Sequence, residues 1–410
     1  MGTKGTRNAQ GDQKTHRGIN LHVSPSPLVS DSRIFKQTLS VARSGLFSNV
    51  VTCGTARAGL PRQENLPYGQ RIDRVGATVH DRQPSVAGRV LEQLSWSRAV
   101  LRFYSQGDID IRVINAHSVA VLPVCYLLSR RLGAKLIYDT QELETETGSS
   151  IGMQRWIFKV IERSLITRCD AVIVVNRSIA DWYRRRYRGV QPVVVRNVSE
   201  VDASRRPCDF RSQLSVSTDE RLFVLAGNLG EGRNIRAILD TFATPAVNAH
   251  VVFLSGGGKL DPLVSEYCAR YPNIHRFPAV PPTEVVHYVA ECDVGLCLTE
   301  PSCLSHRLSL PNKAFEYAQA GLPFFFTDLP EIDRLLGPAF VSWRVGDPSH
   351  DLTAAITALT TNAIEEARAD MARLRIPSWD EEAAAMVAVY SALVLHYAAK
   401  LGRRRGGTRR

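Results

Sequence analysis

The residues best suited to binding a charged ligand lie in one stretch, Pro311-Asn312-Lys313-Ala314-Phe315-Glu316. Lys313 and Glu316 are three positions apart, so on a helix they share one side of the first turns. A helix N-terminus also presents free backbone N–H groups, which favour anionic ligands. We therefore expect this helix start to bind a polar anionic ligand. An ordinary surface ion pair between Lys313 and Glu316 would give the same spacing.

The flanking sequence predicts how this stretch is held. Pro311 suits the first position of a helix, and Gly321 followed by Pro323 ends it. Apolar residues at helical spacing predict one buried face, made by Ala314, Phe315, Ala318 and Leu322. The run 324–326 then predicts a buried strand.

A glycine-rich turn opens the second half of the chain. The strand expected at 222–226 is followed by Gly227-Asn228-Leu229-Gly230-Glu231-Gly232-Arg233-Asn234 and then by a helix at 235–242. Glycines such as Gly230 and Gly232 let backbone N–H groups approach a phosphate, and Arg233 adds a permanent cation. A second glycine loop, which contains Gly257, follows the strand at 250–254.

Polar side chains also follow two strands of the first half. The strands expected at 112–115 and 135–138 lead into His117 and into Asp139 and Glu142. Ligands of open α/β sheets bind at the carboxyl ends of strands, so these three residues are candidates for a second wall of the site. The alternation of strand and helix from residue 19 onward predicts parallel doubly wound sheets.

The motif Pro-Asn-Lys-x-Phe-Glu-Tyr-x-x-x-Gly-Leu-Pro resembles the donor-site helix of GT-B glycosyltransferases, especially family-4-like enzymes. The resemblance extends from about residue 19 to the last helix. It implies an α/β fold of GT-B architecture, in which two Rossmann-like domains with doubly wound parallel sheets face each other across a cleft.

The resemblance also implies roles for residues. Glu316 would bind the ribose of a nucleotide sugar, while Arg233 and Lys313 would stabilise the leaving diphosphate. His117 would line the sugar site. His117, Arg233 and Lys313 are the predicted catalytic residues. The remaining substrate-binding candidates are Asn312, Gly230, Gly232, Gly257, Asp139, Glu142 and Ser305. The sequence departs from the family at Leu308, where a second glutamate is usual, and at Gln141, where a histidine is usual.

The expected domain organisation follows from these patterns. Residues 1–18 are expected to be a disordered segment, 19–200 an acceptor-binding domain, 201–218 a linker and 219–378 a nucleotide-sugar-binding domain. Residues 379–400 are expected to form a closing helix that packs toward the first domain, before a basic tail at 401–410. The Arg-, Gly- and Pro-rich segment 57–85 is interpreted as an irregular insertion or acceptor-side loop.

Composition restricts the partners. The net charge of +11 suits an anionic partner, and no nucleic acid is expected. Eight cysteines without a C-x-x-C pair argue against a zinc site and favour a reducing cytosol. The sequence also shows no carboxylate cluster, so we expect neither a metal nor a cofactor.

The cluster Trp182-Tyr183-Arg184-Arg185-Arg186-Tyr187-Arg188 is predicted to dock on an anionic membrane, whereas the helix at 154–168 is interpreted as core-packed. A cytoplasmic protein, peripheral on the inner face of the plasma membrane, is expected.

Together these features predict a hexosyltransferase that moves a sugar from a UDP- or GDP-sugar to a lipid-linked or polysaccharide acceptor. Cell-envelope or exopolysaccharide biosynthesis is the expected context, and retention of configuration is implied by the family alone. Two alternatives stay open: a nucleotide-sugar epimerase of GT-B fold and a non-catalytic membrane-docked scaffold. A nicotinamide-dependent oxidoreductase ranks low, because the strand at 250–254 ends in Ser255-Gly256 and not in an acidic residue.

Overall fold

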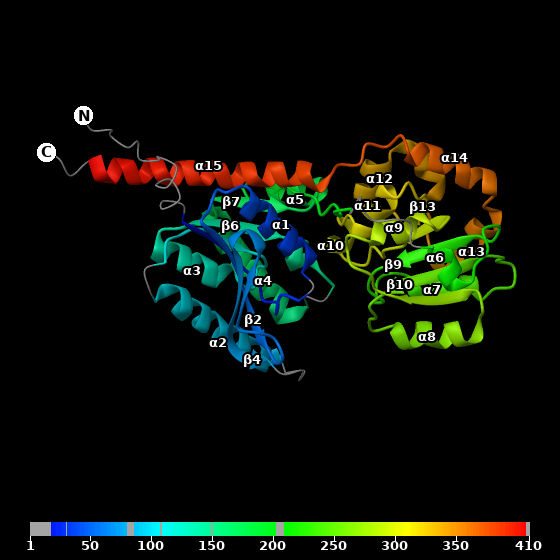
Figure 1. The fold of residues 1–410 in the computed structure, drawn as a ribbon, viewed down its shortest axis with the longest axis horizontal. Helices are drawn as coiled ribbons and strands as arrows, with labels where there is room; N and C mark the ends of the chain where they lie inside the picture. The colour runs from blue at the N-terminus through cyan, green and yellow to red at the C-terminus, as the bar shows by residue number, and fades with distance from the viewer. Residues whose placement is uncertain are drawn as a thin grey trace, which may run out of the picture.

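The computed structural model describes residues 18–29, 31–79, 86–106, 109–148, 151–201 and 209–406. They form two α/β domains joined by two crossing segments, whose described parts are residues 195–201 and 372–379 (Figure 1). Residues 1–17 of the expected disordered segment, residues 202–208 of the expected linker and residues 407–410 of the basic tail lie outside the described residues. No helix within the described residues is long and apolar enough to cross a membrane.

The N-terminal domain is built on an eight-stranded sheet with the order β3-β4-β2-β1-β5-β6-β7-β8. Its strands are β1 (Ile19–Val23), β2 (Asn49–Arg57), β3 (Gln63–Leu66), β4 (Gln70–Val79), β5 (Ile111–Ala116), β6 (Lys135–Thr140), β7 (Ala171–Val174) and β8 (Val193–Val194). All neighbours are parallel except β3, which runs antiparallel to β4. The chain order reverses between β1 and β5, where a doubly wound sheet places its ligand crevice.

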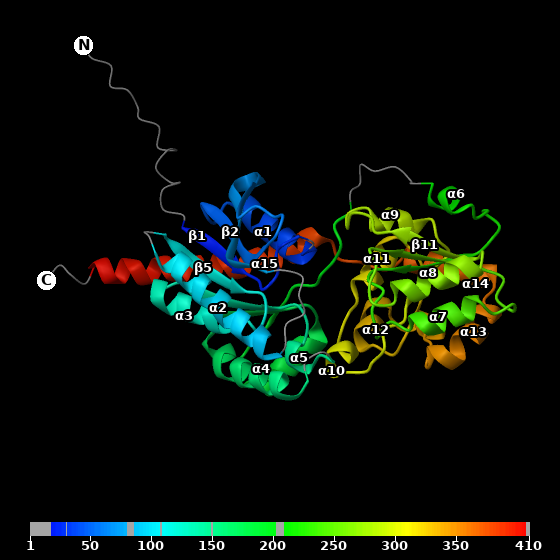
Figure 2. The ribbon, with the colours of Figure 1, turned by 90° about the horizontal axis from the view of Figure 1, so that it is seen from below.

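Helices cover both faces of this sheet, and each face has its own buried core (Figure 2). One face carries α1 (Ser32–Arg43) and the final helix α15 (Trp379–Gly406); the other carries α2 (Val86–Ser105), α3 (Leu122–Leu132), α4 (Gly152–Leu165) and α5 (Arg177–Arg186). Helices on both faces explain why most side chains of the central strands are buried, including the polar Asn20, His22 and Asn115.

The segment 57–85 differs from its prediction. Its described part is regular: β2 extends to Arg57, and β3 and β4 form a hairpin whose second strand pairs in parallel with β2. The prediction of irregular structure failed because arginines here satisfy backbone carbonyls, a role that composition does not reveal. Arg62 donates to Arg74 O at 3.4 Å, and Arg74 donates to Pro61 O at 3.0 Å.

The helix expected to be packed in the core is also partly exposed. Ile151, Met153, Trp156 and Val160 are all exposed at or just before α4, although Ile161 and Leu165 pack on the core as predicted. The buried side of α4 centres on Glu162, which accepts hydrogen bonds from the hydroxyls of Tyr138, Tyr183 and Tyr187 at 2.7–3.1 Å. The helix is therefore anchored by a buried polar cluster that helical periodicity does not show.

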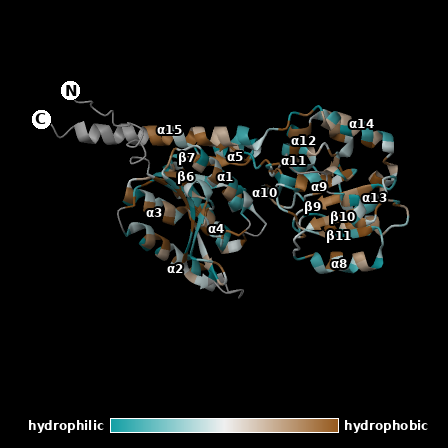
Figure 3. Cartoon of the chain, in the orientation of Figure 1, coloured by the Kyte–Doolittle hydropathy of each residue, from teal (hydrophilic) through white to brown (hydrophobic). Residues whose placement is uncertain are grey.

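The C-terminal domain has a five-stranded parallel sheet with the order β11-β10-β9-β12-β13. Its strands are β9 (Leu222–Ala226), β10 (His250–Ser255), β11 (Ile274–Pro278), β12 (Val294–Cys297) and β13 (Phe324–Phe326). Its helices are α6 (Phe210–Leu214), α7 (Ile235–Phe242), α8 (Asp261–Arg270), α9 (Val285–Ala290), α10 (Leu304–Arg307), α11 (Asn312–Gln319), α12 (Pro330–Leu336), α13 (Pro348–Ala358) and α14 (Thr361–Met371). Hydrophobic residues concentrate along the central strands (Figure 3).

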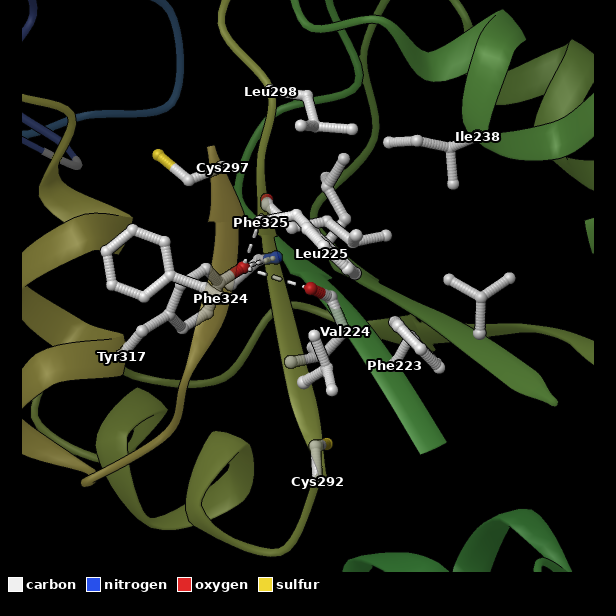
Figure 4. Packing of buried hydrophobic residues seen from close by; sticks show 14 of the residues in the cluster. Phe223, Val224, Leu225, Ile238, Cys292, Cys297, Leu298, Tyr317, Phe324 and Phe325 are labelled. Carbon is white, nitrogen blue, oxygen red and sulfur yellow. Dashed lines mark hydrogen bonds between the residues drawn. The ribbon is translucent and has the colours of Figure 1, made fainter. Parts of the chain in front are cut away.

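Tyr317 lies between β9 and β12, where the order in which the chain adds strands to this sheet reverses (Figure 4). β9 and β12 pair only through Val294 and Gly295, and the buried Tyr317 hydroxyl lies where they diverge. The hydroxyl donates to Val224 O at 3.1 Å and accepts from Ala226 N at 3.0 Å. A Cβ on Gly295 would lie 2.6 Å from the Tyr317 ring, so only glycine leaves room for it.

The last helix returns to the N-terminal domain. Trp379, Met386 and Tyr390 of α15 are buried against the sheet face that α1 also covers. The Trp379 indole N–H donates to Ser40 Oγ at 3.0 Å, and Asn115 Nδ2 donates to the Tyr390 hydroxyl at 2.7 Å. These contacts attach the crossing segment to the N-terminal domain.

Replacing Gly295 by alanine should destabilise the C-terminal domain, because the added Cβ overlaps the Tyr317 ring. Overpacking of a tight core typically costs about 1–3 kcal/mol. Chemical denaturation followed by circular dichroism measures the loss. Gly148→Ala is the matched control, since a Cβ there meets nothing within 4 Å and should leave the midpoint unchanged. Equal midpoints for Gly295→Ala and wild type would contradict the packing described.

Candidate active site

A cavity of about 460 Å³ lies at the carboxyl edge of the C-terminal sheet. Two glycine loops, at 227–228 and 256–258, line it together with Glu316 and the segment 279–280. Ser32, the first residue of α1, adds a contribution from the N-terminal domain. The cavity therefore opens between the two domains, beside the switch point between β9 and β12, as the rule for open α/β sheets predicts.

The two glycine loops hold each other in place. Leu229 N donates to Gly257 O at 3.0 Å, and Leu260 N donates to Leu229 O at 2.8 Å. Gly258 has a φ of +150°, and a Cβ on it would lie 2.6 Å from Leu229 O. Glycine is therefore required there for close approach of the loops, which leaves a rigid floor of backbone groups in the cavity.

Two cations lie behind this floor. Lys313 is buried, and burial lowers its pKa to about 8; Arg233 nearby also lowers it, whereas Cys297 and Glu316 raise it. Burial likewise lowers the pKa of Arg233. The buried Lys313 and the half-buried Arg233 are neighbouring positive charges with one carboxylate, Glu316, beside them, and a bound anion would stabilise this arrangement.

Glu316 faces the segment that links the domains. Burial raises its pKa, while the Ser199 hydroxyl, Lys313 and Lys36 lower it. Ser199 Oγ donates to Glu316 Oε1 at 3.3 Å, and the next turn of α11 adds Gln319 Nε2, which donates to Ser199 O at 3.0 Å. The carboxylate expected to bind ribose is thus engaged by a hydroxyl of the crossing segment.

Lys36 of α1 is a cation that the sequence analysis did not identify. Its ammonium donates to Val198 O at 2.5 Å and lies 4.5 Å from the centre of the Trp379 ring. Burial lowers its pKa to about 8, and Arg33 lowers it further, whereas Glu200 and Glu316 raise it. No motif marks Lys36, because its partners come from both crossing segments and from α11.

His117 and Asp139 occupy a buried network and not the cavity. The His117 side chain is 0% exposed; Nδ1 lies 3.3 Å from Asp139 Oδ2, and Nε2 lies 2.8 Å from His22 Nδ1. Arg33 Nη2 donates to Asp139 Oδ1 at 3.2 Å. Burial raises the pKa of Asp139, but Arg33 and His117 lower it by more, so the net shift is downward. These two candidates are therefore close to each other but covered in this conformation.

A contact between the domains lies at α10, next to the first glycine loop. Ser305 of α10 is buried and donates to Glu142 Oε2 at 3.5 Å. A Cβ on Gly232 would lie 3.1 Å from the His306 ring, so the first glycine loop packs directly on α10. Partial burial raises the pKa of Glu142, which His306 and Ser305 lower. The structure thus brings Ser305, Glu142 and Gly232 into one region.

Leu308 takes a role different from that of the usual glutamate. Leu304 and Leu308 pack against the core of the N-terminal domain, and Leu308 O accepts a hydrogen bond from Asn176 Nδ2 at 2.7 Å. The segment expected as a loop at 300–309 therefore contains α10, which docks the C-terminal domain onto its neighbour (Figure 1).

Asn312 lies outside the cavity. It is exposed, and Asn197 Nδ2 donates to its side-chain oxygen at 3.0 Å. Of the predicted site residues on the C-terminal domain, Gly257 and Glu316 line the cavity. Gly230, Gly232 and Arg233 lie further along the first glycine loop, and Lys313 lies near Arg233 and Glu316. Among the described residues, no group of three or more His, Cys, Asp or Glu side chains is arranged to hold a metal ion.

Comparison with known structures defines the class of fold. Sucrose-phosphate synthase from Thermosynechococcus elongatus is 15% identical, with a TM-score of 0.65 over 96% of this chain and 100% of that one. Anabaena HepE, solved with UDP-glucose, is 14% identical, with a TM-score of 0.60 over 94% and 99%. WaaG, a glycosyltransferase involved in lipopolysaccharide biosynthesis, is 14% identical, with a TM-score of 0.60 over 90% and 99%. The predicted GT-B architecture is confirmed.

The family comparison adds the N-terminal domain. Residues 39–198 match the glycosyl transferase 4-like domain. A search of curated proteins finds no match to this sequence. The chain therefore has a GT-B fold, and its residues 39–198 are similar to the glycosyl transferase 4-like domain, so the resemblance noted in the sequence is confirmed at that level.

Binding of a nucleoside diphosphate should weaken above pH 8. Lys313 loses its proton as the pH rises through its pKa of about 8, and the diphosphate then loses one cation. Isothermal titration with UDP and GDP from pH 7 to 9.5 should show Kd rising by up to tenfold per pH unit above pH 8. Lys313→Met should bind more weakly and without this rise.

Lys36→Met is the control for this pH dependence. Lys36 titrates in the same range but contacts the crossing segment, so the variant should keep the wild-type slope. A flat profile for wild type, or an unchanged slope in Lys313→Met, would assign the effect to another group.

Proposed function

We propose that this protein is a glycosyltransferase that takes a sugar from a nucleoside-diphosphate sugar bound to the C-terminal domain. The observation that carries the proposal is a pair of neighbouring cations, the buried Lys313 and the half-buried Arg233, next to the glycine-loop cavity that Glu316 lines. Cations withdrawn from water without a matching number of carboxylates favour a ligand that brings negative charge. A nucleoside diphosphate supplies that charge, a ribose for Glu316 and a base that fits the remaining cavity.

In the proposed reaction, the acceptor hydroxyl oxygen bonds to the anomeric carbon while the bond from that carbon to the diphosphate breaks. The departing diphosphate gains negative charge, which Arg233, Lys313 and the loop amides stabilise. Retention of configuration would follow if the leaving phosphate oxygen takes the acceptor proton on the same face. Exclusion of water between the two domains limits hydrolysis of the donor.

The sugar would lie toward the contact between the domains. Ser305 and Glu142 meet there, and His306 packs beside the glycine loop. Because Leu308 is used for docking, these polar groups are the nearest candidates for hydroxyl recognition. His117 and Asp139 would take part only after a rearrangement that uncovers them, so we assign them a positioning role behind the site.

We propose a UDP- or GDP-hexose as donor, and a lipid-linked or polysaccharide acceptor held by the N-terminal domain in envelope or exopolysaccharide biosynthesis. HepE, solved with UDP-glucose, and WaaG, involved in lipopolysaccharide biosynthesis, support this choice by analogy. A cytoplasmic enzyme that acts on such acceptors would work at a membrane surface.

We further propose that α4 docks the protein on anionic lipid, together with α5. Trp156 is 62% exposed, and Met153 and Val160 are exposed on the same helix, whereas Lys159 is paired with Glu146. On α5, Trp182 packs against Tyr183 and Tyr187, so the exposed members of the predicted cluster are Arg184, Arg185 and Arg186 and, just beyond the helix, Arg188. Apolar insertion would come from α4 and electrostatic attraction from α5.

Glu316→Ala should abolish most donor binding and transfer, because the ribose loses its acceptor. Arg233→Ala should lower transfer by about 100-fold or more, the typical loss for a group that stabilises developing charge. Thermal unfolding with UDP, GDP, ADP and NAD shows which nucleotide raises the midpoint. Arg236→Ala, an exposed arginine on the following helix, is the matched control.

The outcome also separates the alternatives. Product formation from the donor without any acceptor would indicate an epimerase or hydrolase, and nucleotide binding without turnover would indicate a scaffold. Stabilisation by NAD alone would indicate an oxidoreductase. Near-normal transfer in folded Glu316→Ala would refute the site assignment.

Removing the apolar side chains of α4 should release the protein from vesicles. Trp156→Ser combined with Val160→Ser should lower co-sedimentation with phosphatidylglycerol vesicles at least fivefold, because about 1.5–3 kcal/mol is gained per large side chain that inserts. Val341→Ser, an exposed valine of the C-terminal domain, should bind like wild type. Equal sedimentation of wild type with neutral and anionic vesicles would contradict the electrostatic part.

A further inference from the structure

A second cavity, of about 640 Å³, lies in the N-terminal domain between α1 and the β3–β4 hairpin. Its walls are mainly aliphatic and aromatic, with Phe35 and Leu39 from the helix and Leu66 and Ile72 from the hairpin. Val29 and Tyr68 are 55% and 63% exposed. The size is typical of a small-molecule site, and an open apolar hollow of this kind loses unfavourable contact with water when an apolar group fills it.

The backbone of the cavity wall is strained at two positions. Leu28 and Tyr68 have φ values of +58° and +60°, and only three other non-glycine residues in the described part of the chain have positive φ. One of those, Asn234, ends the glycine loop of the donor cavity. Bulky residues in this conformation persist only where the surroundings hold them, and they are enriched at ligand sites.

A buried arginine holds the wall in this shape. Arg74 donates from Nε to Pro27 O at 2.8 Å and from Nη2 to Leu28 O at 3.1 Å, and its Nη1 reaches Glu64 Oε2 at 3.0 Å. Arg74 thereby ties the loop after β1 to the hairpin. On the hairpin side, the Arg43 guanidinium lies 5.1 Å from the centre of the Tyr68 ring. The cavity is thus formed before any ligand arrives.

The cavity lies beside the donor cavity along a single helix. Ser32 at the start of α1 lines the donor cavity, whereas Phe35, one turn further, lines the second cavity. Three residues of helix rise only about 4.5 Å. A molecule seated in the second cavity could therefore extend past the first turn of α1 into the donor cavity.

We propose that this cavity binds an aliphatic chain of the glycosyl acceptor, so that the acceptor is an amphiphile whose hydroxyl-bearing head points into the cleft. The proposal rests on the proposed function and deepens it by naming the acceptor class. An unmodified polysaccharide fits the cavity poorly, since its many hydroxyls would lose water against aliphatic walls. The charged groups are already engaged, Arg74 with Glu64 and Arg43 with Tyr68, which favours a neutral chain.

Isothermal titration with two glucosides tests the cavity. Octyl β-D-glucoside, kept below its micelle concentration, and methyl β-D-glucoside share a head group and differ only in the chain. Wild type should bind the octyl compound at least tenfold more tightly. Leu39→Gln and Val29→Asn should each reduce this preference at least threefold. Val341→Asn, a matched valine that is 59% exposed elsewhere, should keep it.

Equal affinity for both glucosides in wild type, or an unchanged preference in both cavity variants, would overturn the proposal. A similar loss in Val341→Asn would do the same, because it would mean unspecific binding of the chain. Thermal stabilisation by nucleoside diphosphates is measured in parallel and should be unchanged in the cavity variants. Its absence in wild type would refute the proposed function, independently of the octyl preference.

Discussion

The hydroxyl of Tyr317, hydrogen-bonded between β9 and β12, is the contact on which the arrangement of the candidate site depends. It lies where the two central strands separate, and Gly295 leaves the space that its ring fills. Tyr317 directly follows Glu316 and lies one turn beyond Lys313, so its anchoring sets the position of both charged residues. A buried hydroxyl with donor and acceptor both satisfied permits one orientation of α11, which is a condition for a rigid site.

Polar contacts near Glu316 of α11 connect the two domains. Ser199 bonds to Glu316, Lys36 bonds to Val198, and the Trp379 ring covers the Lys36 ammonium. A ribose that bonds to Glu316 would compete with the Ser199 hydroxyl. A donor bound there would therefore change a contact between the C-terminal domain and the segment that joins the domains.

Much of the C-terminal domain could be predicted because its signals are local. A glycine turn after a strand, or a helix bounded by Pro311 and Gly321, depends on residues that are neighbours in the chain. The N-terminal domain was predicted less well. The hairpin in 57–85 is stabilised by Arg74, whose partners include Pro27 and Leu28, and α4 is anchored by Glu162 through tyrosines of β6 and α5. Such distant hydrogen bonds leave no periodic pattern.

By itself, the sequence determined the two doubly wound sheets and the association of Arg233, Lys313 and Glu316 with a glycine-loop site, because short-range spacing and strand ends dictate them. Only the tertiary structure decided which candidates are accessible. His117 and Asp139 follow strand ends as predicted, yet neighbours from β1 and α1 cover them. Lys36 carries no motif, yet it reaches the crossing segments, because burial and charge pairing depend on segments that meet only in the folded chain.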